Sequence, residues 1–69
     1  MDWEHLSAGW NQYGDRVREQ WSKLTDEDLA AIAGDYDRLI DTIQLRYGVQ
    51  REQAELELVE WLEVLKIRG

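Results

Sequence analysis

The apolar residues fall into four segments whose spacing is typical of amphipathic helices. In the first segment apolar side chains recur every three or four positions, and at about 100° per residue they form a stripe roughly 80° wide. Gly9 and Gly14 interrupt this stripe, and each costs about 1 kcal/mol relative to alanine inside a helix. We therefore expect one core-facing helix whose first turns fray or bend. Its apolar residues are Trp3, Leu6, Trp10, Tyr13, Val17, Trp21 and Leu24.

A short second helix is predicted between Thr25 and Gly34. Thr25 is a favourable N-cap, because its hydroxyl can accept the backbone N–H of Asp28 while the Asp28 carboxylate reaches back, as in a capping box. The acidic triplet Asp26-Glu27-Asp28 then faces the positive end of the helix dipole. The glycine-containing spacing of a calcium loop is absent. We interpret the triplet as a helix start and expect no metal there.

Two longer helices complete the pattern. Asp35 can cap the third, and Gly48 can end it in the left-handed conformation. The apolar residues of this helix are Tyr36, Leu39, Ile40, Ile43 and Tyr47. The fourth is expected from about residue 50 to about residue 65, and its inner face would be Ala54, Leu58, Trp61, Leu62 and Leu65. The pattern predicts a single all-α domain over residues 1–69, built as a small four-helix bundle.

Size and composition place the chain near the lower limit for a domain that folds alone. A chain this short buries only about 60% of the surface that it exposes when unfolded. It has no cysteine, so neither a disulfide nor a thiolate metal site can supplement the core. Four tryptophans and three tyrosines can do so, since each buries on the order of 150–250 Å².

The charge balance argues against nucleic-acid and membrane partners. Eight basic residues stand against fifteen acidic ones, for a net charge of −7, whereas phosphate backbones and anionic lipid surfaces require clustered cations. The longest apolar run, residues 29–33, is far shorter than the roughly 20 residues of a membrane span. The N-terminal stretch lacks the apolar core of a secretory signal. We expect a soluble, cytoplasmic protein.

Few residues could support catalysis. His5 is the sole histidine and there is no cysteine, so a nucleophile–base pair has one possible base. Paired carboxylates would need a desolvated pocket to separate their pKa values, and a small helical domain rarely encloses one. Phosphate-binding glycine loops are also absent. We expect no enzyme activity, no catalytic residue, no cofactor and no small-molecule ligand.

The stretch "WNQYGDRVREQWSKLTDEDLAAIAGDYDRLIDTIQLRYGVQREQAE" resembles the CsbD-like family of small bacterial stress-response proteins. The resemblance covers roughly residues 9–61. It implies a bundle of two crossing helical hairpins and induction by general or osmotic stress, and it implies no reaction and no catalytic residues. The positions that carry it are Trp10, Gln12, Val17, Trp21, Lys23-Leu24-Thr25 with the following acids, Ile32, Gly34, Leu39, Ile43-Gln44, Tyr47-Gly48 and Gln53-Ala54.

The chain departs from the family pattern at two leucines. Leu45 and Leu56 stand where the family usually has charged residues, and both are expected to point away from the core. With Val64 and Ile67 of the apolar-rich end "LEVLKIRG" they could form one interaction patch, or the end of the chain could cover them. The leading hypothesis is a non-enzymatic stress-response protein. The alternative is a protein-interaction module or weak homodimer that uses this patch, and a third is nucleic-acid mimicry by the acidic surface.

Overall fold

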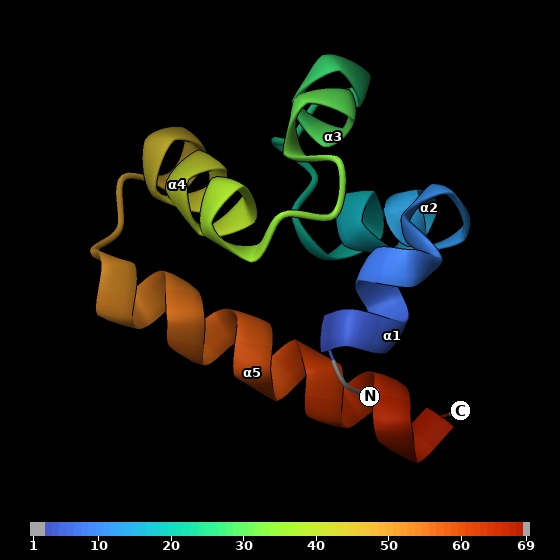
Figure 1. The fold of residues 1–69 in the computed structure, drawn as a ribbon. Coiled ribbons are helices and arrows are strands. Elements are labelled where there is room, and N and C mark those ends of the chain that lie inside the picture. Colours follow the sequence, from blue (N-terminus) through green and yellow to red (C-terminus); the bar gives the residue numbers. More distant parts are fainter. Residues whose placement is uncertain (1–2, 69) are drawn as a thin grey trace.

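The computed structural model describes the backbone of residues 3–68 and the side chains of residues 3–65. Helices joined by short loops make up this part of the chain, and it contains no strand, which confirms the predicted all-α fold class. Figure 1 shows that the last helix runs along the lower edge of the molecule, beneath the others. The prediction of four helices is wrong, because the described residues form five. These are α1 (Trp3–Ala8), α2 (Trp10–Gln20), α3 (Asp26–Ile32), α4 (Tyr36–Tyr47) and α5 (Arg51–Arg68).

The first predicted helix is divided at Gly9 and ends at Gln20. Gly9 is the N-cap of α2 and supplies no side-chain hydrogen bond to it. Its backbone N–H still donates to the His5 carbonyl at 3.3 Å, so α1 ends directly against the start of α2. Both Leu6 and Trp10 are buried, on either side of the break. The break falls at Gly9, one of the two glycines at which the sequence predicted that the helix would fray or bend. The observed outcome is a bend between two helices.

The start of α3 and both ends of α4 confirm the predicted caps. Thr25 accepts the backbone N–H of Asp28, and Asp35 accepts that of Arg38 at 3.1 Å. Gly48 ends α4 with a φ of 65°, in the left-handed region that glycine adopts without strain. Helix α5 begins close to its predicted start but continues beyond Leu65 to the limit of the described chain.

The end of α3 differs from the prediction by one residue. The C-cap is Ala33, which has a φ of 48°, and Gly34 follows it with a φ of 82°. Gly34 lies against α1, where the Ser7 hydroxyl donates to its carbonyl oxygen at 2.8 Å. A Cβ atom at Gly34 would lie 2.7 Å from that hydroxyl oxygen. Both the backbone conformation and this close approach require glycine at this position.

The core joins residues from all five helices. Trp10 of α2 donates its indole N–H to the Leu29 carbonyl of α3 at 3.0 Å. Trp21, at the end of α2, packs edge-on against Trp61 of α5 with ring centroids 5.2 Å apart. The buried apolar side chains are Leu6, Trp10, Val17, Trp21, Leu24, Leu29, Ile32, Leu39, Ile40, Ile43, Ala54, Leu58, Trp61 and Leu65. The predicted inner residues are therefore confirmed, except that Trp3, Tyr13, Tyr36, Tyr47 and Leu62 are only partly buried.

Helix α4 is shared between two neighbours. It packs against both α3 and α5, while α1 packs against α2. Figure 1 shows α4 above the first half of α5. The strongest helix contacts thus form a pair and a group of three, which is not the pair of crossing hairpins expected from the resemblance.

Candidate functional site

The acidic triplet at residues 26–28 forms the first turn of α3. The Asp28 N–H donates to the Thr25 hydroxyl at 3.1 Å, and the Thr25 N–H donates to the Asp28 carboxylate at 3.2 Å. This reciprocal arrangement is a capping box with aspartate in place of the usual glutamate or glutamine. The predicted role of the triplet as a helix start is confirmed.

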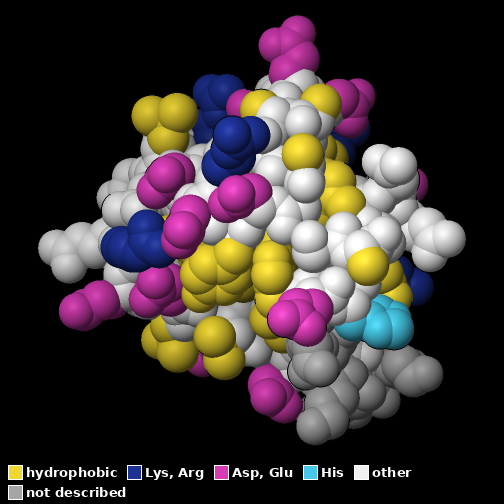
Figure 2. All heavy atoms as spheres, viewed as in Figure 1, with side chains coloured by type: hydrophobic (Ala, Val, Ile, Leu, Met, Phe, Trp, Pro, Cys, Tyr) yellow, Lys and Arg dark blue, Asp and Glu magenta, His cyan; other side chains and the backbone are white. Residues whose placement is uncertain are grey.

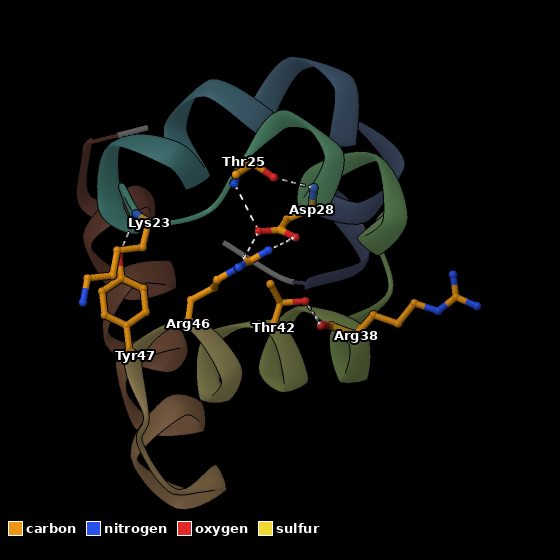
Figure 3. Close-up of polar contacts among 7 residues, drawn as sticks. All are labelled: Lys23, Thr25, Asp28, Arg38, Thr42, Arg46 and Tyr47. Atoms are coloured by element: carbon orange, nitrogen blue, oxygen red, sulfur yellow. Dashed lines mark hydrogen bonds and ion pairs between the residues drawn. The ribbon is translucent and has the colours of Figure 1, made fainter.

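Two arginines engage the triplet from other helices. Arg46 of α4 makes a bidentate contact with Asp28, with Nε–Oδ2 and Nη2–Oδ1 distances of 2.9 and 3.0 Å. Arg18 of α2 contacts Asp26 at 2.6 Å. The pKa of Asp28 is lowered, first by the hydrogen bonds from Arg46 and then by the Thr25 backbone N–H. Figure 3 shows the Arg46 side chain reaching from α4 to the start of α3.

A third arginine, Arg51, joins α4 to α5. Arg51 lies 2.7 Å from Asp37 and 3.7 Å from Asp41, both on α4, and 3.0 Å from Glu55, one turn along α5. These contacts raise the pKa of the Arg51 guanidinium, chiefly through the hydrogen bond to Asp37. The sequence pattern did not predict this cluster. Only the Arg51–Glu55 spacing of four residues could have indicated part of it.

Tyr47 connects the end of α4 with the segment between α2 and α3. Its hydroxyl oxygen accepts the Lys23 backbone N–H at 3.1 Å, and the Lys23 ammonium lies 5.1 Å from the centre of its ring. Figure 3 shows both residues beside the Arg46–Asp28 contact. The polar residues at this edge of the molecule therefore connect helices to one another.

His5 lies exposed on α1, at the edge of an open hollow of about 680 Å³ at the α1–α2 junction. Ser7 also lines this hollow, but its hydroxyl is bonded to Gly34. Among the side chains of residues 3–65, no three histidine, cysteine or acidic groups are arranged to hold a metal ion. No helix within residues 3–68 combines the length and the apolar character that a bilayer span requires.

The described residues of the predicted interaction patch are all exposed. Leu45 is 76% exposed, Leu56 is 52% exposed and Val64 is 45% exposed, whereas the side chain of Ile67 lies outside the described residues. Leu45 projects opposite the buried face of α4 and Leu56 opposite that of α5.

Apolar groups are scattered over the visible surface. Figure 2 shows them separated into small groups by acidic and basic side chains. A further apolar residue, Val59, is 50% exposed and was not among the predicted patch residues. It lies on α5 three residues after Leu56, and this helical spacing is the signal that could have revealed it.

Comparison with known proteins identifies relatives of the chain. No family model matches it. It is 46% identical over 61 residues to the UPF0337 protein YjbJ of Escherichia coli K12, and the matched segment covers 88% of each chain. It is 44% identical over 61 residues to YjbJ of Salmonella typhimurium, covering 88% of this chain and 87% of that one. A UPF0337 protein of Rhodopseudomonas palustris is 39% identical over 66 residues, covering 96% of this chain and 100% of its own. On this similarity the chain belongs to the UPF0337 family.

Proposed function

We propose that the chain is a non-enzymatic protein of the general or osmotic stress response, which acts in the cytoplasm through its bulk properties or through a protein partner. Its membership of the UPF0337 family and its resemblance to CsbD-like stress-response proteins support this proposal. In this proposal the chain binds no nucleic acid, no membrane and no small molecule. Its net charge of −7 also favours solubility at high concentration.

The observation that carries the proposal is that arginine and carboxylate side chains pair with one another and so join the helices. Asp28 is held by Arg46, and the carboxylates around Arg51 join α4 to α5. A catalytic carboxylate pair needs a desolvated pocket that separates two pKa values. Apart from Asp28 and Glu55, which are partly buried, these carboxylates are exposed, and all are paired with arginine, which is an arrangement that stabilises a fold.

Survival after osmotic upshift tests this proposal. A bacterial strain that lacks its own UPF0337 gene is compared with the same strain carrying the wild-type chain or an empty plasmid. We expect the chain to restore survival and to accumulate after the upshift. Equal survival of all three strains, with no accumulation of the protein, would contradict the proposal.

A second candidate function is that of a protein-interaction module or weak homodimer. It is favoured by the exposure of Leu45, Leu56 and Val64. Sedimentation from micromolar to millimolar concentration tests the dimer, which should tighten as salt screens the repulsion between copies. Leu56→Lys should abolish such a dimer without loss of helicity. A monomer at every concentration and salt level would exclude it.

A further inference from the structure

The outer face of α5 carries a stripe of apolar and acidic residues. At about 100° per residue its members fall within roughly 100° of one another, directly opposite the buried residues of the same helix. All of them are exposed, so α5 has an apolar component on both its faces. We call this set the outer stripe; its members are Glu52, Leu56, Val59, Glu60 and Glu63.

The negative charge of the outer stripe is not compensated within the described part of the molecule. Arg51, the basic residue at the start of α5, is turned toward α4 by its contacts with Asp37 and Asp41. Glu52, Glu60 and Glu63 form no ion pair with any residue from 3 to 65. The outer stripe therefore presents a leucine and a valine beside three exposed carboxylates that are paired with none of the side chains of residues 3–65.

A surface hollow adjoins the outer stripe at its N-terminal end. It has a volume of about 450 Å³ and is lined by Val49, Gln50, Glu52, Gln53 and Leu56. Two apolar side chains thus border a hollow that also contains a carboxylate. Figure 2 shows hydrophobic and acidic side chains beside one another along the lower left edge, where the first half of α5 lies. An apolar side chain of a partner could enter here while a neighbouring cation meets Glu52.

We propose that the outer stripe and this hollow bind a cationic amphipathic helix of another protein. The inference rests on the interaction module of the second candidate function and names its surface and the chemistry of its partner. Such a helix would place apolar residues on Leu56 and Val59 at helical spacing, with lysine or arginine opposite Glu52, Glu60 and Glu63. A second copy of this chain fits less well, because two outer stripes would oppose glutamate to glutamate.

The experiment measures the fluorescence anisotropy of a labelled helical peptide made only of leucine and lysine, with its leucines on one face. The full chain should bind this peptide with a dissociation constant on the order of micromolar, because one helix buries less area than a stable interface. Leu56→Ser should raise that constant about tenfold, as expected when a central apolar contact is lost. A peptide of the same composition with its leucines dispersed around the helix should bind at least about tenfold more weakly.

Matched variants separate the outer stripe from general charge attraction. Leu45→Ser removes a leucine of α4 that is even more exposed than Leu56, and it should leave binding unchanged. Glu60→Gln should weaken binding several-fold, whereas Glu19→Gln, which makes the same charge change on α2, should not. Circular dichroism verifies that each variant keeps its helices.

Three results would overturn the proposal. Equal effects of Glu60→Gln and Glu19→Gln, or of Leu56→Ser and Leu45→Ser, would show that the peptide recognises net charge or any exposed leucine. A dimer that Leu56→Ser dissociates, together with no peptide binding, would assign the outer stripe to a second copy. Because these measurements use purified protein, their failure is distinct from a failure to restore survival under osmotic stress.

Discussion

Asp28 accepts hydrogen bonds both from Arg46 of α4 and from Thr25, the N-cap of its own helix. The Arg46 guanidinium of α4 contacts both of its carboxylate oxygens, and the Thr25 backbone N–H donates to one of them. A single carboxylate therefore caps the start of α3 and fixes α4 beside it. Bidentate contacts of this kind hold a defined geometry better than single surface ion pairs do.

The pairing predicts a specific dependence of stability on pH. The pKa of Asp28 is lowered from its ordinary value of 3.8, so its stabilising contribution is present above about pH 4 and is lost as pH falls through the lowered pKa. Arg46→Gln should therefore reduce the melting temperature at pH 7, and the difference from wild type should shrink below about pH 4. Thermal denaturation across this pH range measures it.

Arg16→Gln is the matched control for that experiment. Arg16 is exposed on α2 and forms no ion pair with the described side chains, so its loss changes the net charge equally. An equal effect of both substitutions at pH 7 would show that net charge is responsible and that the Arg46–Asp28 contact is not.

Removal of the N-cap should destabilise the fold. Thr25→Ala deletes the hydroxyl that accepts the Asp28 N–H, at a usual cost of about 1 kcal/mol. In a domain of this size that corresponds to a fall of about 4–8 °C in melting temperature. Thr25→Ser should retain most of the stability, and Ser22→Ala, which removes an exposed hydroxyl nearby, should have little effect. An unchanged melting temperature for Thr25→Ala would rule out a stabilising cap.

The left-handed alanine at the end of α3 predicts a stabilising substitution. Ala33 has a φ of 48°, a conformation that costs residues with a Cβ about 1–2 kcal/mol. Ala33→Gly should remove this strain and, after the added entropy of the unfolded chain, raise stability by about 0.5–1 kcal/mol. Ala30→Gly, in the middle of the same helix, should lower it by about 1 kcal/mol. If chemical denaturation gave both substitutions the same sign, Ala33 could not be strained.

The acidic triplet is expected to bind no metal tightly. Arg46 engages Asp28 and Arg18 engages Asp26, so a divalent cation would have to displace two guanidinium groups. Calorimetric titration with calcium or zinc should show no saturable site. Saturation at one site with micromolar affinity, abolished by Asp26→Asn with Asp28→Asn, would reverse this interpretation.

The sequence predicted the local features of the fold well, because each depends on a few neighbouring residues. The capping box at Thr25, the cap at Asp35 and the stop at Gly48 all follow from side-chain chemistry within one helical turn. The buried stripes of the helices follow from a period of 3.6 residues.

The features that escaped prediction depend on contacts between distant segments. Ala33 takes a left-handed conformation that local preference assigns to glycine, and Gly34 beside it contacts Ser7 of α1. The contacts of Arg51 with Asp37 and Asp41 join α5 to α4, and helical periodicity alone does not specify them.

The most direct test of the proposed function separates catalysis from other modes of action. Survival after osmotic upshift is measured in a strain that lacks its UPF0337 gene and carries either the wild-type chain or a variant with His5→Gln, Glu4→Gln and Glu27→Gln. These side chains are exposed and form no ion pair with described residues, so the variant should fold and restore survival as fully as the wild type. A folded variant that fails to restore survival, while the wild type succeeds, would contradict a non-enzymatic role.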